Sequence, residues 1–254
     1  MTDRRFLGNP LWKAYEVFVM AFGLGMLALL CIAWLPCALI LKPLLPAARG
    51  QRLGRWMIMG GFRVYLRLLE IFGAFHFDLD ELDSLRGAGP LVIAANHPSL
   101  LDAVMIVSRL PNAVCVMKSA LMDNILFGAG ARLAGYIPNN APLAVILGAR
   151  EELRAGAHLL IFPEGTRTVN FPVDPCTPST GLIASRSGAP VQTLLIEFTT
   201  PYLGKAWPLF RPPQLPLHCR VRLGQRFAPP TDVAVFTTEL DAYFRLQLAS
   251  PAAA

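Results

Sequence analysis

The hydrophobic pattern of this chain changes character near residue 70. An uncharged apolar run extends over residues 17–41 and is long enough to cross a membrane as a helix. A second apolar segment, residues 56–69, predicts another helix that lies on or in the membrane. We therefore expect residues 1–70 to be membrane-anchoring helices and residues 71–254 to form a separate domain. The alternative is a buried helical hairpin that packs on that domain.

Beyond residue 70, short β-rich apolar runs alternate with segments of helical periodicity. Strands are expected at residues 75–79, 91–95, 113–117, 158–162, 191–198 and 220–227. Helices are expected at residues 101–109, in a region that ends near residue 133, and at 142–155, 181–187 and 231–248. This alternation predicts an α/β domain with a mostly parallel sheet and flanking helices.

Basic residues follow the first apolar run, and no acidic residue occurs between Glu16 and Glu70. The basic positions are Lys42, Arg49, Arg52, Arg55, Arg63 and Arg67. Such a bias marks the cytoplasmic side of a membrane and attracts anionic headgroups. The run is also too long for a signal-peptide core and lacks a convincing cleavage site. We expect it to be retained, in the inner (cytoplasmic) membrane, with the domain facing the cytoplasm.

Composition excludes some classes of function. The formal net charge is +6, but the basic cluster adjoins the apolar run instead of forming a stripe interleaved with aromatic residues, so no nucleic-acid partner is expected. The mean hydropathy of +0.46 is high for a freely soluble protein. The 5 cysteines are odd in number and lack metal-type spacing, which indicates reduced thiols. No metal site is predicted.

A histidine and an aspartate follow the apolar run at residues 91–95, in the sequence Asn96-His97-Pro98-Ser99-Leu100-Leu101-Asp102. In α/β folds, the carboxyl ends of strands face the ligand crevice. Pro98 keeps His97 out of the helical region, which predicts His97 in a turn and Asp102 in the next helix. The carboxylate can then hold one imidazole nitrogen while the other accepts a proton. Taken alone, Asp102 can also be an acid that favours a helix N-terminus.

A second motif, Phe162-Pro163-Glu164-Gly165-Thr166-Arg167, follows another expected strand. Glycine lets backbone amides approach a ligand closely, and the planar guanidinium of Arg167 suits a phosphate or carboxylate. Alone, the hexapeptide indicates only a turn. Together with His97 and Asp102, it predicts an active site at one edge of the sheet.

The two motifs closely resemble those of the glycerolipid acyltransferase family, whose bacterial type is the 1-acyl-glycerol-3-phosphate acyltransferase. Three further segments are similar to family blocks: Lys118 after the second strand, Gly135-Tyr136-Ile137, and Gly188-Ala189-Pro190-Val191. The resemblance implies a membrane-bound O-acyltransferase of phospholipid biosynthesis that needs no cofactor. It also implies acyl-CoA or acyl-carrier protein as donor and a lysolipid, foremost 1-acylglycerol-3-phosphate, as acceptor.

The resemblance assigns a role to each motif residue. His97 would be the general base and Asp102 would orient it. The substrate-binding residues would be Lys118, Glu164, Gly165, Thr166 and Arg167, with the two basic ones holding the acceptor's headgroup. Backbone amides near Gly165 or Asn96 are candidates for stabilising the oxyanion. Pro190 and Val191 would line the acyl-side surface.

The second block departs from the family pattern. Where the family usually carries an arginine, this chain has Pro138-Asn139-Asn140, and no basic residue occurs between Arg132 and Arg150. A different acceptor, such as a lyso-aminolipid or a specialised lipid-like metabolite, therefore stays open. A non-catalytic membrane scaffold is a further alternative, although a scaffold has no need for the base and carboxylate pair.

Overall fold

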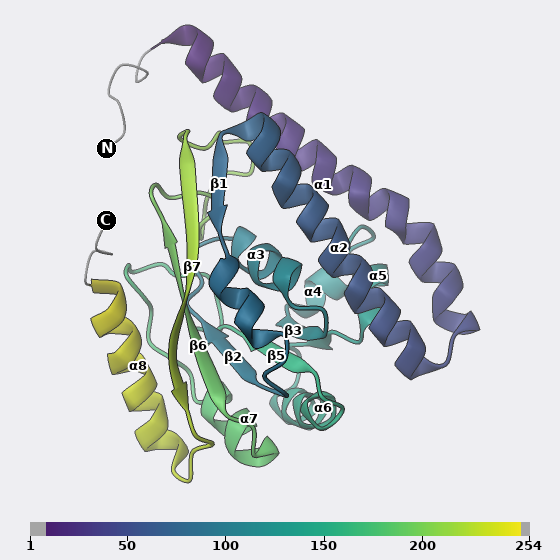
Figure 1. Cartoon of the computed structure of the whole chain (residues 1–254), viewed down its shortest axis with the longest axis vertical. Coiled ribbons are helices and arrows are strands. Elements are labelled where there is room, and N and C mark those ends of the chain that lie inside the picture. Colours follow the sequence, from purple (N-terminus) through teal and green to yellow (C-terminus); the bar gives the residue numbers. More distant parts are fainter. Residues whose placement is uncertain (1–8, 250–254) are drawn as a thin grey trace.

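The computed structural model describes residues 9–249. Its strands are β1 (Phe75–Asp78), β2 (Val92–Ala95), β3 (Ala113–Met117), β4 (Ile137–Pro138), β5 (His158–Ile161), β6 (Val191–Phe198) and β7 (Leu217–Phe227). They form one sheet in the order β1-β7-β6-β2-β5-β3-β4 (Figure 1). The strands from β6 to β4 in this order run parallel, β7 is antiparallel to β6, and β1 is parallel to β7. The predicted α/β class and mostly parallel sheet are thus confirmed.

The helices lie on both faces of the sheet. They are α1 (Pro10–Leu44), α2 (Ala47–Gly73), the 3-10 helix η1 (Asp80–Leu85), α3 (Leu101–Arg109), α4 (Ser119–Met122), α5 (Gly128–Ala134), α6 (Pro142–Arg154), α7 (Ser179–Ser187) and α8 (Val233–Ala249). Most bounds lie within two residues of the expected ones. The exceptions are α1 and α2, which extend beyond the expected segments 17–41 and 56–69 at both ends, and β7, which begins three residues early. The helical region expected to end near residue 133 is two helices, α4 and α5, and β4 and η1 were not expected.

Alternate residues of the central strands enter two separate cores. Ile93 and Ala95 of β2 pack in one core with α2 and α3, whereas Val92 and Ala94 pack in the other with α6, α7 and α8. A strand that is buried on both faces has a continuous run of apolar residues. These strands could therefore be predicted although their polar and apolar residues do not alternate clearly. The sheet is thereby held rigidly between two helical layers.

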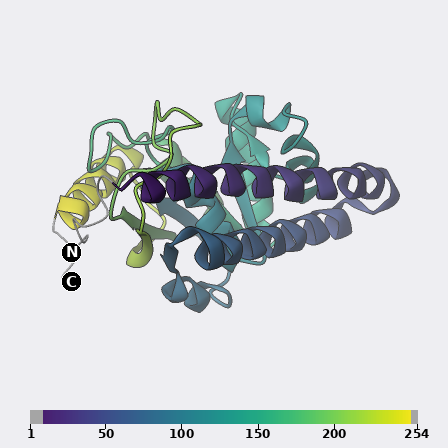
Figure 2. The same cartoon turned by 90° about the horizontal axis from the view of Figure 1, so that it is seen from above.

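The two N-terminal helices lie side by side and differ in burial (Figure 2). Tyr65, Leu66 and Leu69 of α2 are buried in the same core as the strands, so α2 packs on the domain. By length and composition, α1 is the one described helix able to cross a membrane, and its most apolar 18-residue window has a mean hydropathy of 2.5 and is 6% buried. The hairpin alternative therefore fits α2, while α1 keeps most of its apolar surface exposed.

Arg55 locks α2 onto the domain. Its guanidinium is 4% exposed, donates to Ala134 O and Asn112 Oδ1, and pairs with Glu152 Oε2 at 2.6 Å. At neighbouring Gly54, an added Cβ would lie 2.8 Å from the Ala134 nitrogen, so only glycine permits this approach of α2 to α5. Arg55 was expected in the headgroup-attracting cluster; it is instead buried and paired.

Candidate active site

The two sequence motifs meet at one edge of the sheet. His97 follows β2, and residues 162–167 follow β5, its neighbour in the sheet. Lys118 follows β3 and Asn139 follows β4, the next two strands in order. Because these four strands run parallel, their carboxyl ends share an edge, and the fold alone brings the four segments together.

His97 and Asp102 form a direct pair. The imidazole Nδ1 lies 2.8 Å from Asp102 Oδ2, and the same oxygen accepts the Ser99 amide at 2.8 Å. Ser99 Oγ in turn accepts the Leu101 amide, which starts α3 directly after the turn. With Nδ1 held by the carboxylate, Nε2 is the nitrogen left to exchange a proton.

Burial defines the electrostatics of this pair. The Asp102 side chain is fully buried, and desolvation raises the pKa of its carboxyl to about 6, against the lowering effects of His97 and the Ser99 amide. The His97 ring stacks on Phe162 with centroids 3.7 Å apart and planes 11° apart. The first residue of the second motif therefore fixes the imidazole plane.

Glu164 joins the two motifs from below the surface. It is 6% exposed, and its Oε1 accepts the His97 amide at 2.8 Å and the Thr168 hydroxyl at 2.9 Å. Its Oε2 accepts the Asp174 amide at 2.9 Å. Burial raises the pKa of the Glu164 carboxyl, while these donors oppose the shift. Both carboxylate oxygens thus accept hydrogen bonds from the protein itself. The family resemblance assigned Glu164 to substrate binding, but its contacts are those of a positioning residue.

Gly165 shapes the turn after β5. Its φ of +69° lies in the left-handed region, which favours glycine. Its amide donates to Phe162 O at 2.9 Å and closes the turn. This amide was a candidate for oxyanion stabilisation, but the turn already uses it. The Asn96 side chain exchanges hydrogen bonds with the Ile196 backbone and braces β2 against β6.

Arg167 and Thr166 both contact the loop at residues 199–216. Arg167 Nη1 donates to Leu203 O at 2.9 Å and Gly204 O at 2.6 Å, so the guanidinium anchors this loop over the motif. The Thr166 hydroxyl accepts a hydrogen bond from the exposed Lys205 ammonium. The Val169 amide chiefly lowers the pKa of Asp174, and Lys205 adds to the effect.

Sequence reasoning missed Lys205. It lies in a loop without periodicity, far along the chain from both motifs, and only its neighbours Gly204 and Pro208 marked the segment as a loop. Lys118 carries an exposed side chain at the N-terminus of α4, and Asn139 is exposed with its amide bonded to Met117 O. The edge thus presents Lys118, part of Arg167, and Lys205.

Pro190 and Val191 lie elsewhere. Val191 is level with Val92 in the parallel pairing of β6 and β2, five residues before His97. At about 3.3 Å per residue, this is the opposite edge of the sheet. Val191 is also fully buried. Val191 is therefore a core residue, and the half-buried Pro190 precedes it at this edge, so neither residue lies beside the catalytic pair.

No group of three or more His, Cys, Asp or Glu side chains suited to hold a metal occurs within residues 9–249. The five cysteines are all free thiols. The ionisable groups described at this edge include the His97–Asp102 pair, Lys118, Arg167 and Lys205. This set can deprotonate a hydroxyl and hold an anion nearby.

Comparison with known proteins identifies a family for this part of the chain. Residues 76–197 match the Acyltransferase family model, a segment that runs from β1 to β6 and contains both motifs. Over residues 76–197, the chain is identified as a member of the acyltransferase family. It is 24% identical over 137 residues to the chloroplastic 1-acyl-sn-glycerol-3-phosphate acyltransferase BAT2 of Brassica napus, covering 52% of this chain and 40% of that protein.

A solved structure shares the whole fold. The crystal structure of the 1-acyl-sn-glycerophosphate (LPA) acyltransferase PlsC from Thermotoga maritima matches with a TM-score of 0.69 and 13% identity, over 95% of this chain and 99% of that one. The match includes the N-terminal helices, because it extends over nearly the complete chain. At this identity, the likeness shows that the fold is the same.

Proposed function

We propose that this acyltransferase moves an acyl group from a thioester donor to the hydroxyl of a lysophospholipid, foremost 1-acylglycerol-3-phosphate. The observation that carries the proposal is the His97 Nδ1–Asp102 Oδ2 contact of 2.8 Å at the strand edge, beside exposed cations. A lipid hydroxyl is a poor nucleophile at neutral pH and needs a general base. The similar proteins from Brassica napus and Thermotoga maritima are both named as acyltransferases of this acceptor.

In this mechanism, His97 Nε2 accepts the hydroxyl proton as the oxygen attacks the thioester carbonyl. Asp102 fixes the tautomer and stabilises the imidazolium that forms. When the tetrahedral intermediate collapses, the new ester C–O bond is retained, the C–S bond breaks, and the imidazolium returns its proton to the thiolate. Such base catalysis contributes about 10²- to 10⁴-fold. The donor is acyl-CoA or acyl-carrier protein.

Three cations at this edge of the sheet would hold the acceptor's headgroup. Lys118 and Arg167 follow the family resemblance, and we add Lys205 because its ammonium contacts Thr166 inside the second motif. Arg167 gives part of its donors to the 199–216 loop, so it also positions Lys205. An ammonium and a guanidinium next to each other favour a phosphate-bearing acceptor.

An apolar cavity supports a lipid substrate. It has a volume of about 140 Å³ and lies between α1, α2, α5 and the end of β3. Its lining includes Leu30, Trp34, Phe62, Phe127 and Met117, and the last of these immediately precedes Lys118. Part of one acyl chain can therefore be buried away from water in this cavity, close to the catalytic edge.

We further propose that residues 1–70 hold the protein at the cytoplasmic face of the inner membrane. The exposed apolar length of α1 and the one-sided basic residues after it support this placement. Membrane fractionation and protease access to inside-out vesicles test it. Recovery of the full-length chain in the soluble fraction without detergent would count against the membrane placement.

A different acceptor is the second candidate. It is favoured by one observation: Asn139 is exposed at the end of β4, where the family usually carries an arginine. The deciding experiment assays purified protein in detergent against a panel of lysolipids with both thioester donors. His97→Ala should abolish transfer while leaving the fold intact. Near-wild-type rates for folded His97→Ala would eliminate the mechanism.

A further inference from the structure

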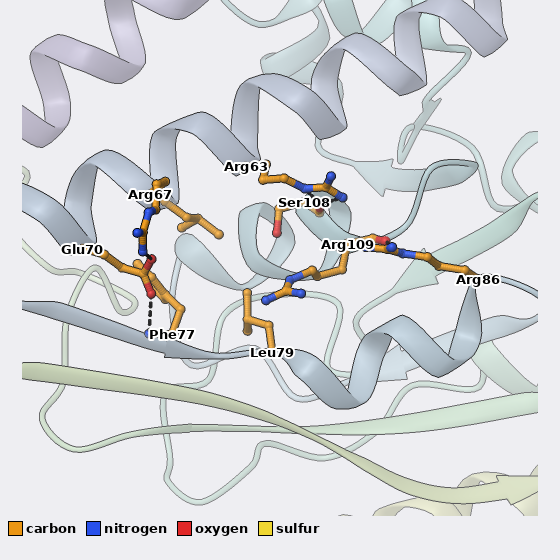
Figure 3. Close-up of a pocket in the computed structure, with 9 residues that line it drawn as sticks. Arg63, Arg67, Glu70, Phe77, Leu79, Arg86, Ser108 and Arg109 are labelled. Atoms are coloured by element: carbon orange, nitrogen blue, oxygen red, sulfur yellow. Dashed lines mark hydrogen bonds and ion pairs between the residues drawn. The ribbon is translucent and has the colours of Figure 1, made fainter.

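A second concentration of charge lies in a pocket of about 350 Å³ between α2, the end of η1 and the end of α3 (Figure 3). Its lining contains four arginines and a single acidic residue: Arg63, Arg67, Arg86, Arg109 and Glu70. The apolar part of the lining comes from Leu66, Phe77 and Leu79. The volume lies within the usual range for small-ligand sites.

This pocket is separate from the active site. Asp102 lies in the first turn of α3, whereas Ser108 and Arg109 lie at its end. The rise from Leu101 to Arg109 is about 12 Å, at 1.5 Å per residue. The pocket therefore occupies the opposite edge of the sheet, and none of its residues touches the catalytic pair.

Three of the arginines are held in fixed orientations. Arg63 donates through Nε and Nη2 to Ser108 O, and Arg86 donates through Nε to Arg109 O. These bonds cap the last carbonyls of α3. Arg109 pairs with Asp80 and Asp83 at 3.0 and 3.1 Å, and Asp83 also pairs with Arg86.

The same contacts leave donors for a ligand. They use two of the three nitrogens of each guanidinium, and within residues 9–249 no partner occurs for Nη1 of Arg63, Nη1 of Arg86 or Nε of Arg109. Arg67 stands at the mouth with 71% of its side chain exposed and one contact to Glu70 at 3.2 Å. Guanidinium groups pre-oriented in this way suit a tetrahedral oxyanion.

Apolar surface adjoins the arginines on α2. Val64 is 52% exposed and lies about 100° from Arg63 around the helix axis, and Ile71 is 57% exposed one turn after Arg67. Helix α1, whose most apolar window is 6% buried, runs beside α2 (Figure 2). A ligand that fits both features has an anionic head and an apolar tail.

We propose that this pocket binds the phosphate of an anionic membrane phospholipid, whose acyl chains lie along the exposed apolar side of α2. The proposal rests on the proposed membrane placement of the N-terminal helices. The lipid is bound and not converted, because the pocket lies about one helix length from His97. Its effect is to hold α2 and the end of α3 at the membrane surface.

The test measures binding of full-length protein, exchanged from detergent, to vesicles of phosphatidylcholine and to vesicles that also contain phosphatidylglycerol. Arg67→Gln removes the exposed pocket cation, and Arg52→Gln is the matched control, an exposed arginine of α2 outside the pocket. The wild type should prefer the anionic vesicles. Arg67→Gln should reduce that preference by about tenfold or more, the effect of one lost charge-assisted bond. Arg52→Gln should retain most of it.

Two further arms make the outcome decisive. Equal losses in Arg67→Gln and Arg52→Gln would show diffuse attraction and overturn the pocket. The wild type could instead bind inorganic phosphate saturably, lose this binding in Arg67→Gln, and show no preference for anionic vesicles. That result would identify a soluble phosphate as the ligand in place of the lipid and would overturn the proposal. Transferase activity in detergent should be unchanged in Arg67→Gln. Absence of wild-type transfer, or of binding to every vesicle, would instead refute the proposed function.

Discussion

The Glu164 carboxylate accepts a hydrogen bond from the backbone amide of His97 at 2.8 Å. The Thr168 amide returns a bond to His97 O, also at 2.8 Å. The turn that carries the imidazole is therefore held on both sides, by Glu164 of the second motif and by Thr168, which directly follows the motif. The two motifs are one unit, since the second positions the backbone from which the first presents its base.

Glu164→Gln should lower kcat by about 10- to 100-fold and leave KM nearly unchanged. The glutamine amide group would face either the Asp174 N–H or the donors of His97 and Thr168, and a lost bond to a charged acceptor costs about 1.5–3 kcal/mol. Steady-state kinetics on folded protein measure the split. Thr168→Val removes one of the same bonds and should give a smaller effect. A raised KM at unchanged kcat would instead place Glu164 in contact with substrate.

Asp102→Asn should lower turnover by about 10²-fold or more, because the amide can no longer stabilise the imidazolium. It should also change the pH dependence of stability. The pKa of Asp102 rises from 3.8 to about 6 on folding, so the folded state holds this proton more tightly and loses stability as pH rises through that window. The asparagine variant should gain stability relative to wild type between those values. Denaturation at several pH values tests this, and a constant difference would refute it.

Arg55→Ala should cost about 3 kcal/mol or more of unfolding free energy. It leaves the Glu152 carboxylate without its ion pair and the Ala134 carbonyl without its donor, and breaking a buried pair is strongly destabilising. The exposed Arg52→Ala is the control and should change stability by less than about 0.5 kcal/mol. Equal stability of the two variants would mean that α2 is not integral to the domain.

The sequence predicted those parts of the fold that depend on local pattern. Strands such as β2 and β5 are continuous apolar runs, and Pro98 set the turn that brings His97 to Asp102. The sequence could not reveal that Arg55 is buried and paired. A basic residue near an apolar run gives the same pattern whether its side chain faces lipid headgroups or Glu152. Its burial depends on Gly54, which lets α2 approach α5.

The sequence predicted that His97 and Asp102 lie together, but it did not predict the contacts that hold them in place. The role of Glu164 depends on where the His97 and Asp174 amides point, and no motif encodes the direction of a backbone amide. Lys205 reaches Thr166 only because Arg167 anchors the 199–216 loop. The family likeness assigned Val191 to an acyl-side surface but gave no level for it in the sheet. Pairing with Val92 puts it at the far edge.

Lys205→Ala should raise KM for 1-acylglycerol-3-phosphate by about tenfold with little change in kcat, because it removes one cation beside the headgroup. Arg186→Ala, at the exposed end of α7, removes the same charge away from the edge and should have no effect. Kinetics with that acceptor and with an uncharged monoacylglycerol give the comparison. An equal effect on both acceptors would show that Lys205 shapes the loop and does not bind the headgroup.

Asn139→Arg should lower KM for 1-acylglycerol-3-phosphate. Asn139 is exposed at the carboxyl end of β4, and its amide bond to Met117 O fixes its backbone at the end of β3, which Lys118 follows. An arginine there would restore the family's third basic group, and a charge-assisted bond to a phosphomonoester is worth about 1.5–3 kcal/mol, or tenfold and more in KM. The neighbouring Asn140→Arg adds the same charge one position further and controls for general attraction. If the wild type already has a tight KM that Asn139→Arg does not change, the departure at this position has no bearing on acceptor choice, and Lys118, Arg167 and Lys205 suffice.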